Sequence, residues 1–315
     1  MTNKEKYQNF CKLEKNIPIF NQSWWLDAVC NHDWEVVLIE NNGEIIAAMP
    51  YFVIKKLGFD IISMPKLTQN MGPYIKYPDN QKYHKKLSYE KEVMTKLINK
   101  LPAFDSYSKN FNYSITNLLP FHWKGFKQST RYTYILDDMV ELESVIDNFS
   151  SECRNNIEKA RRKVKIIEDD NLGEFYKIVK MSFDRQNINI PYSYNFLKMI
   201  DNASTNNNSR KILFAIDQNN DEVHAAIYLI WDGKSVYLLA SGGNPSLRNS
   251  GAKYLLVLKA ITFAIDNGLI FDFEGSMIEN VEKFNRSFGA RQQPYSNITK
   301  INSHVLGIKK ILKEL

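Results

Sequence analysis

Two widely separated segments show the apolar, β-branched pattern of a β-hairpin. In residues 34–53, WEVVLIENNGEIIAAMPYFV, two such runs meet at Asn42-Gly43, a dipeptide typical of tight hairpin turns. Residues 211–231, KILFAIDQNNDEVHAAIYLIW, repeat the pattern around a polar turn. Each hairpin has an Ala-Ala pair near the start of its second strand, namely Ala47-Ala48 and Ala225-Ala226. This match favours a duplicated unit, although two unrelated hairpins built from common strand residues would share it.

Between the hairpins, apolar residues recur every three or four positions, which predicts a helical connection between two halves. The residues with this spacing are Leu142, Val145, Ile146, Phe149, Cys153, Ile157, Ala160 and Val164. The end of the stretch is basic, with Arg154, Lys159, Arg161, Arg162, Lys163 and Lys165. Such a run is either a solvated helix face, paired in part with Glu158, or an anion-binding surface.

Strands and helices alternate through the rest of the chain. The pattern predicts helices at 172–183 and 194–200, a strand at 235–240, a glycine loop at 241–253, a helix from about 252 to Asn267-Gly268, a strand at 269–275, a helix at 279–288 and a strand at 295–301. This order predicts an α/β or mixed α+β fold. With 315 residues the chain is long enough for two domains, which we place at 1–140 and 141–315.

Composition narrows the class of protein. Hydrophobic residues make up 44% of the chain and charged residues 24%, so an ordinary globular core is expected. The first ten residues contain no apolar signal region, and the most apolar later stretch, 254–265, is interrupted by Lys259 and Thr262. Neither a secretion signal nor a transmembrane segment is predicted. The formal charge of +6 permits an anionic ligand without requiring one.

Cysteine and histidine usage argues against a metal or a disulfide framework. The three cysteines are odd in number and form no CxxC pair, and the five histidines form no HxH or HxxxH pair. We therefore expect no metal site, and a reduced, cytoplasmic compartment.

The loop at 241–253, SGGNPSLRNSGAK, is the first candidate site. Glycines that lead from a strand into a helix expose backbone N–H groups that bind pyrophosphate. The residues expected to form this cradle are Ser241, Gly242, Gly243, Arg248 and Gly251. The loop has neither a Walker nor a GxGxxG pattern, and a plain strand-to-helix turn remains the alternative.

The second candidate is FDFEGS, residues 271–276, where Asp272 and Glu274 lie two residues apart and are expected on one face of a strand. Phe271 and Phe273, on the opposite face, are expected in the core. Burial would raise the pKa of a carboxyl group, so we predict Glu274 as a general base and Asp272 as its helper. The alternative is a structural carboxylate that caps the next helix or pairs with Arg248 or Arg286.

The third candidate, NVEKFNRSFGA at residues 280–290, resembles the corresponding element of GNAT acyltransferases through Asn280, Phe284, Phe288 and Gly289. The combination FEGSMI, KFNRSFGA and Gln293-Pro294-Tyr295 is similar to the FemAB-like branch, as is RNNIEKARRKVKI at 154–166. The likeness is most specific over residues 150–295. In the N-terminal half it is weak and is carried mainly by FNQSWWLDA at 20–28.

The resemblance implies two tandem GNAT-like domains, each a mixed and mostly antiparallel sheet flanked by helices, with the donor site in the C-terminal domain. GNAT enzymes often have Tyr, and Fem-type enzymes Lys, where this chain has Asn285, so the usual catalytic side chains are missing at that position. Asn280, Asn285 and Arg154 are then expected to contact the substrate.

The function implied is transfer of an acyl group, from acetyl-CoA or another acyl-CoA, to an amine on a sugar, an amino acid or a nucleotide- or lipid-linked cell-surface precursor. One alternative is a Fem-type transferase that uses aminoacyl-tRNA, although no long coiled-coil insertion is visible. Another is a degenerate, non-catalytic GNAT pair that acts as a binding module. Peripheral membrane contact is compatible with any of these, and the sequence leaves the oligomeric state open.

Overall fold

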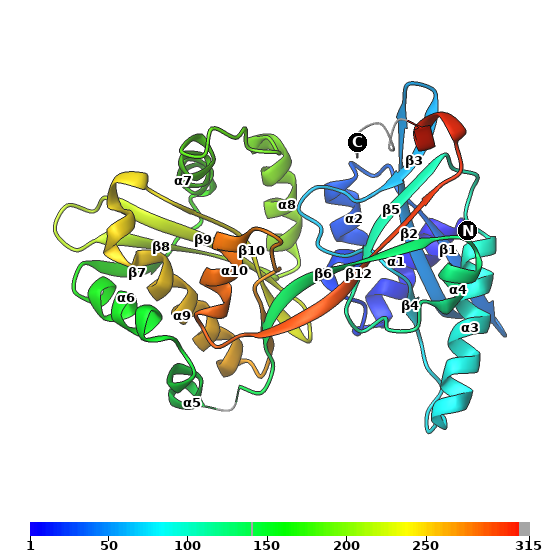
Figure 1. Cartoon of the computed structure of the whole chain (residues 1–315), viewed down its shortest axis with the longest axis horizontal. Helices are drawn as coiled ribbons and strands as arrows, with labels where there is room; N and C mark the ends of the chain where they lie inside the picture. The colour runs from blue at the N-terminus through cyan, green and yellow to red at the C-terminus, as the bar shows by residue number, and fades with distance from the viewer. Residues whose placement is uncertain (140, 309–315) are drawn as a thin grey trace. The chain divides into compact units, whose positions relative to one another are not determined.

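The structure is a computed structural model that describes residues 1–139 and 141–308 (Figure 1). It divides into two compact units, Met1–Arg131 with Pro294–Leu315, and Tyr132–Gln293. The predicted boundary at 140/141 differs from this division, since the end of the chain returns to the first unit. Among the described residues, no helix is long and apolar enough to cross a membrane.

The first unit is a mixed sheet with helices. Its elements are α1 (Asn3–Leu13), η1 (Ile19–Asn21), α2 (Ser23–Val29), β1 (Glu35–Asn41), β2 (Glu44–Lys56), β3 (Phe59–Ser63), β4 (Tyr74–Ile75), α3 (Tyr83–Asn99), β5 (Ser106–Phe111) and α4 (Leu119–Trp123). The strand order is β1-β2-β3-β5-β12, with β4 beside β2. Only β3 and β5 run parallel, and the other pairs that these strands form are antiparallel.

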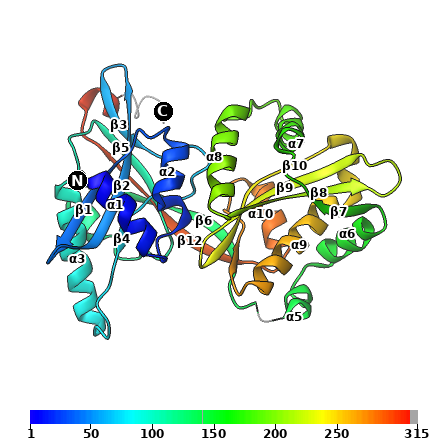
Figure 2. The ribbon, with the colours of Figure 1, turned by 180° about the vertical axis from the view of Figure 1, so that it is seen from behind.

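The second unit repeats this plan. Its elements are α5 (Leu142–Asp147), α6 (Ser151–Arg161), β7 (Val164–Glu168), α7 (Leu172–Asp184), α8 (Tyr194–Asn206), β8 (Arg210–Asp217), β9 (Val223–Trp231), β10 (Ser235–Gly243), η2 (Pro245–Ser250), α9 (Ala252–Asp266), β11 (Ile270–Asp272) and α10 (Glu279–Arg286). The strand order is β7-β8-β9-β10-β11-β6, and only β10 and β11 run parallel. Helices α7 and α8 cover one face of this sheet, while α6 and α9 cover the other (Figures 1 and 2).

The two hairpins occupy equivalent positions in their sheets. The order β1-β2-β3-β5 in the first unit corresponds to β8-β9-β10-β11 in the second, and in both the hairpin precedes the parallel pair. Ala47 and Ala48 on β2 and Ala225 and Ala226 on β9 are all buried. The matching topology agrees with the duplicated arrangement that the sequence pattern favoured.

Two strands cross the unit boundary, and they explain why the predicted boundary differs. The second half of β12 (Arg291–Ile301) pairs antiparallel with β5, from Ser296 opposite Phe111 to Ile301 opposite Ser106. The end of β6 (Lys127–Leu136) pairs with β11. The first unit therefore takes part of β12 from outside its segment 1–131, whereas the part of β6 that pairs with β11 lies within the second unit's segment Tyr132–Gln293.

The predicted connecting helix is in fact two helices, α5 and α6, which pack into the core of the second unit. The helix breaks because Phe149 turns inward and is buried, and because the Ser150 hydroxyl oxygen accepts a hydrogen bond from the Cys153 N–H and starts a new helix. Val164, the last residue of the predicted periodicity, begins β7 instead.

Candidate functional site

The parallel strands β10 and β11 part shortly after they begin to pair. Their register runs only from Ser235 opposite Ile270 to Tyr237 opposite Asp272. Strand β10 continues six residues further to Gly243, roughly 20 Å at 3.3 Å per residue. The sequence predicted a longer β11 and a shorter β10, and both ends differ from that prediction. Beyond Tyr237, one edge of β10 faces away from β9. This edge pairs with no strand among the described residues.

The chain after β11 makes a tight left-handed turn. Glu274 and Gly275 both have positive φ, 58° and 65°. A Cβ atom on Gly275 would lie 2.1 Å from the Tyr132 carbonyl oxygen, so only glycine fits this approach to β6. Phe273 donates its N–H to the Tyr134 carbonyl. Glu274 therefore lies in a turn held against β6, not on a strand that it shares with Asp272.

Asp272 is fully buried and accepts two hydrogen bonds on one oxygen. The Thr133 hydroxyl donates to Asp272 Oδ1 at 2.5 Å, and the Glu274 backbone N–H donates to the same atom at 2.8 Å. The neighbouring Phe271 and Phe273 are buried in the hydrophobic core, as the alternation predicted. The carboxyl groups of Asp272 and Glu274 are thus close neighbours.

Glu274 has the features of a proton-transfer residue. Its Oε1 atom is buried and accepts no hydrogen bond from the described residues. Burial raises the pKa of Glu274 well above its ordinary value, and the charge of Asp272 raises it further. The alternative of an ion pair with Arg286 is wrong, because the Arg286 guanidinium binds Glu282 at 2.8 Å. Arg248 is exposed and forms no ion pair with any described residue.

At the far end of β10, Gly242 and Gly243 are strand residues rather than an open loop. A Cβ atom on Gly242 would lie 2.5 Å from Val179 Cα on α7, so this glycine permits close packing. The N–H of Gly243 is engaged, because it donates to the Ser182 hydroxyl at 2.9 Å. Ser241 is also in β10, opposite Ile227. The Gly243 N–H is therefore not available to the predicted cradle, and a donor-binding role of Ser241 and Gly242 stays a prediction.

The start of α9 does present a free donor. Gly251 has φ 78°, and a Cβ atom there would lie 2.2 Å from the Asn156 carbonyl oxygen. No described residue accepts a hydrogen bond from the Lys253 N–H. The Lys253 ammonium lies 4.7 Å from the Phe284 ring centroid, and desolvation lowers its pKa to about 8, with the nearby Arg185 adding to the effect. With the exposed Arg248 on η2, this end of α9 combines positive charge with helix N-terminal N–H groups.

The three expected substrate residues lie in different surroundings. Arg154 donates to the carbonyl oxygens of Asp147 and Phe149, at 3.2 and 2.7 Å, and so caps α5. Asn280 is exposed on α10. Asn285 is buried, and its Nδ2 finds no partner among the described residues. Among the described residues, no contact joins these three side chains.

Sequence reasoning missed Thr133 and Lys253. Thr133 lies on β6, 139 residues before Asp272, so no local pattern connects the two. A weak signal for Lys253 was available, because a lysine in the first turn of a helix opposes the helix dipole.

The first unit closes the corresponding gap between its parallel strands. Strand β3 ends at Ser63, and the chain that follows is not helical until α3. The Met71 N–H donates to the Asn110 carbonyl on β5, and Gly72 packs against the Phe111 ring. The described part of the first unit thus lacks the long open strand edge, and the helix that follows β3 starts only at Tyr83.

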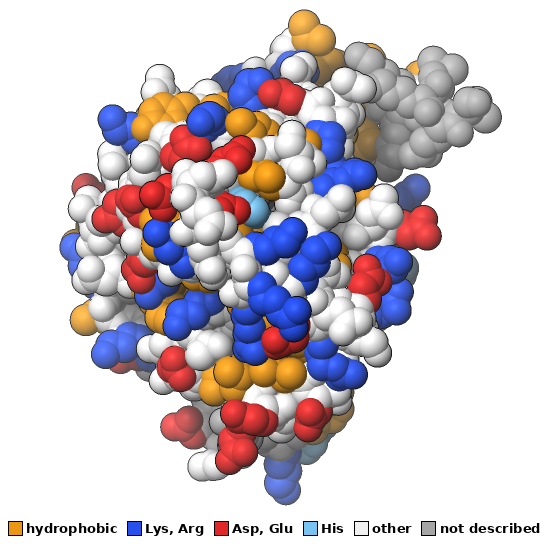
Figure 3. Space-filling view, turned by 90° about the vertical axis from the view of Figure 1, so that its left-hand side faces the viewer, with side chains coloured by type: hydrophobic (Ala, Val, Ile, Leu, Met, Phe, Trp, Pro, Cys, Tyr) orange, Lys and Arg blue, Asp and Glu red, His pale blue; other side chains and the backbone are white. Residues whose placement is uncertain are grey.

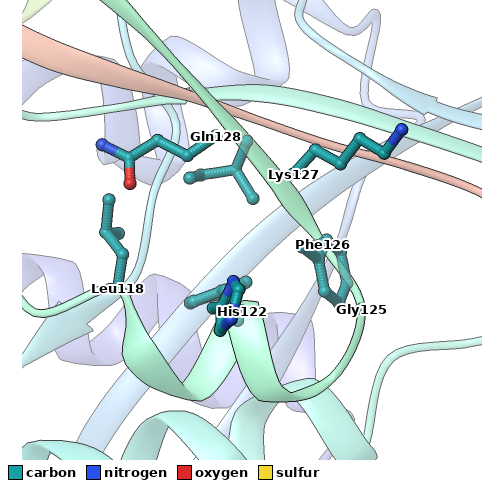
Figure 4. A pocket seen from close by; sticks show the side chains of 8 residues that line it. Leu118, His122, Gly125, Phe126, Lys127 and Gln128 are labelled. Atoms are coloured by element: carbon teal, nitrogen blue, oxygen red, sulfur yellow. The ribbon is translucent and has the colours of Figure 1, made fainter.

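A separate open cavity of about 520 Å³ lies in the first unit (Figure 4). Its walls are mostly apolar and are formed by Leu118, Phe121, His122, Gly125, Phe126, Lys127, Gln128 and Ile298. In Figure 4 the ammonium end of Lys127 points away from His122. The cavity has a size suited to a small ligand, but no acid and base groups are in contact there.

The basic run at the end of α6 is exposed, and Lys and Arg side chains gather on the face in Figure 3. Arg161 pairs with Glu158 at 2.6 Å, and Lys165 pairs with Asp221 at 2.9 Å. The exposed cations without an ion pair to any described residue are Lys159, Arg162 and Lys163. The run is therefore partly a solvated, paired face, and anion binding by its remaining cations stays a prediction.

The fold of the whole chain is that of FemX and of tandem GNAT proteins. The structure of FemX superposes with a TM-score of 0.68 at 12% identity, covering 94% of this chain and 96% of that one. The structure of L-PGS from Bacillus licheniformis gives 0.58 at 11% identity, covering 98% and 95%. A tandem GNAT protein from the clavulanic acid biosynthesis pathway gives 0.55 at 6% identity, covering 96% of each. No curated protein matches the sequence.

Residues 150–280 match the family model of the acetyltransferase (GNAT) domain. Most of the second unit is therefore similar to a GNAT acetyltransferase domain, and the resemblance inferred from the sequence motifs is confirmed. The chain is accordingly a transferase with the predicted mixed α/β architecture. Within the part of the chain that the structure describes, no three His, Cys, Asp or Glu residues are grouped to hold a metal.

Proposed function

We propose that this protein transfers an acyl group from an acyl-CoA thioester, with acetyl-CoA the leading candidate, to a primary amine. The observation that carries the proposal is the parting of β10 and β11. It leaves a long open strand edge, with the carboxyl groups of Asp272 and Glu274 where that edge begins and a positively charged helix start after it in the chain. These are the parts that an extended anionic thioester needs.

The spacing of these parts favours a long donor. Glu274 follows β11 at the level where the strands separate, whereas β10 runs on for six residues, roughly 20 Å, before the turn that leads into α9. A phosphate group at α9 would contact the Lys253 N–H, with Arg248 supplying charge. An arm containing amide groups could then pair with the open edge of β10 and carry the thioester to Glu274.

Glu274 is the group proposed to move the proton between the amine and the sulfur, with Asp272 as its helper. Acyl transfer needs the amine aligned with the carbonyl carbon, a donor that stabilises the oxyanion, and removal of one proton from nitrogen. A desolvated carboxyl with a raised pKa suits proton transfer near neutral pH. Asn280, exposed on α10, remains a candidate contact for the acceptor, which we expect to be an amino sugar, an amino acid or a cell-surface precursor.

Ligand-dependent thermal unfolding of the full chain tests the donor. We expect acetyl-CoA and CoA to raise the melting temperature and acetyl phosphate to leave it unchanged, because a ligand at 100 times its Kd stabilises by about 2.7 kcal/mol. Release of free thiol in the presence of a panel of amino sugars and amino acids then tests turnover. Binding without thiol release from any amine would favour a non-catalytic binding protein, and no response to CoA would refute the donor assignment.

Aminoacyl transfer is the second candidate, favoured by the similarity of the whole chain to the FemX structure. An aminoacyl-tRNA donor would contact a wider basic surface, such as the exposed cations that follow α6. Stabilisation by aminoacyl-tRNA, but not by acetyl-CoA, would decide for this alternative. The salt dependence of that stabilisation would report the number of phosphates bound.

A further inference from the structure

The two carboxyl groups at the parting of the strands receive unequal hydrogen bonding. Asp272 Oδ1 accepts from the Thr133 hydroxyl and from the Glu274 N–H. Glu274 Oε1 is buried without a donor among the described residues. Hydrogen bonds donated to a carboxyl oxygen stabilise its negative charge, whereas burial without donors favours the neutral acid. Two adjacent buried carboxyls rarely ionise together, because their charges repel.

We propose that Asp272 carries the single negative charge of this pair, that Glu274 carries the proton, and that Thr133 is the positioning residue that fixes this order. The raised pKa of Glu274, caused first by burial and then by Asp272, agrees with this assignment. Thr133 itself is buried on β6, and its neighbours Tyr132 and Tyr134 contribute the backbone carbonyls against which the turn after Asp272 is built.

Other titratable groups near this turn are occupied elsewhere. The Tyr134 hydroxyl donates to Glu282 and accepts from Gln292, and Glu282 also binds Arg286. On β10, the Tyr237 hydroxyl donates to Asp232. Asp272 is the charged group that acts on Glu274.

The arrangement gives Glu274 a defined order of proton transfers. This part of the inference rests on the proposed acyl transfer. The neutral amine attacks the thioester carbon, and a tetrahedral intermediate forms. The carbon–sulfur bond then breaks while the Glu274 proton moves to sulfur, which leaves as a thiol. The Glu274 carboxylate next takes a proton from the nitrogen of the new amide, so Glu274 ends the cycle protonated and Asp272 stays ionised throughout.

Infrared spectroscopy of the full chain locates the proton without requiring activity. At pH 7 we expect the carbonyl stretch of a buried, un-ionised carboxylic acid, lost in Glu274→Gln and retained in Asp272→Asn. In Thr133→Val the acid signal should shift in part to Asp272, because the Asp272 carboxylate loses its hydroxyl donor, and Thr133→Ser, which keeps the hydroxyl, should restore the wild-type titration. An acid signal that survives Glu274→Gln but disappears in Asp272→Asn would overturn the proposal, even if Thr133→Val does not fold.

The pH profile of kcat/KM tests the catalytic part separately. If Glu274 enters the reaction as an acid, kcat/KM falls as pH rises through its pKa. Loss of the Thr133 hydrogen bond destabilises the Asp272 carboxylate, so the pair should hold its last proton more tightly and this limb should move to higher pH, by up to about one unit, a tenfold change in proton affinity. A limb that rises through the same pKa would show that Glu274 enters as a base and would refute the order of transfers. Absence of turnover with every donor would refute the proposed function. The infrared result would still decide whether the proton lies on Glu274 or on Asp272.

Discussion

Gly242 of β10 lies directly against Val179 of α7, where a Cβ atom on residue 242 would approach Val179 Cα to 2.5 Å. We expect Gly242→Ala to lower the free energy of unfolding by about 1–3 kcal/mol, because backbone must move to admit the methyl group. Gly243→Ala is the matched control, since its nearest neighbour would be 3.5 Å away. Denaturant unfolding of both variants measures the difference. Equal stability, with loss of CoA binding only in Gly242→Ala, would instead return Gly242 to the donor cradle.

Glu274→Gln should abolish turnover while it preserves the fold. The amide has the shape of the protonated acid but cannot exchange a proton, so we expect kcat to fall by roughly 10²–10⁴-fold. Thermal unfolding and CoA binding should stay close to those of the wild type. Glu279→Gln, on the exposed start of α10, is the control for loss of a carboxyl group near the site. A less stable Glu274→Gln protein with full activity per folded molecule would mean that Glu274 is structural.

We expect alanine variants of Arg154 and Arg248 to differ in effect, one on the stability of the protein and the other on its affinity for the donor. Arg154→Ala removes two hydrogen bonds to carbonyl oxygens at the end of α5, so we expect a loss of about 0.5–1.5 kcal/mol in unfolding free energy and unchanged CoA affinity. Arg248→Ala removes an exposed cation beside α9, so we expect about tenfold weaker CoA binding and unchanged stability. Titration calorimetry and thermal unfolding of both variants check the pair. The reverse pattern would place the anion contact at Arg154.

Lys109 should make the stability of the protein depend on pH. Its side chain is fully buried in the first unit and donates to the Pro50 carbonyl, and burial lowers its pKa to about 7. The unfolded chain binds this proton up to about pH 10, so stability rises with pH between 7 and 10 and the full penalty of about 4–5 kcal/mol applies below pH 7.

Lys109→Met removes this group and should therefore stabilise the chain more at pH 6 than at pH 10. Lys127→Met, at an exposed position on β6, is the control and should show no such difference. Unfolding by urea at both pH values is the measurement. A stabilisation independent of pH would show that Lys109 is not desolvated in the folded state.

Local pattern predicted those elements whose burial has a regular period. The hairpins, the helix at 252–266 and the buried Phe271 and Phe273 follow from spacing alone, and Asn267-Gly268 ended the helix as expected. The pattern overestimated the length of β11. The alternation of apolar and polar residues continues through Glu274, but the positive φ of that residue ends the strand. It also merged α5 and α6, since the buried Phe149 at the break fits the helical spacing.

The sequence by itself determined the α/β class, the repeated hairpin, the GNAT resemblance and the closeness of Asp272 and Glu274 in the chain, because each depends on neighbours in the chain. Only the tertiary structure decided that β12 pairs with β5, that Gly242 packs on α7, and that Thr133 binds Asp272. These contacts join segments far apart in the sequence. Spacing shows that a glycine or a carboxylate is present, but only the folded chain shows which atom lies against it, and that neighbour sets both its packing and its proton affinity.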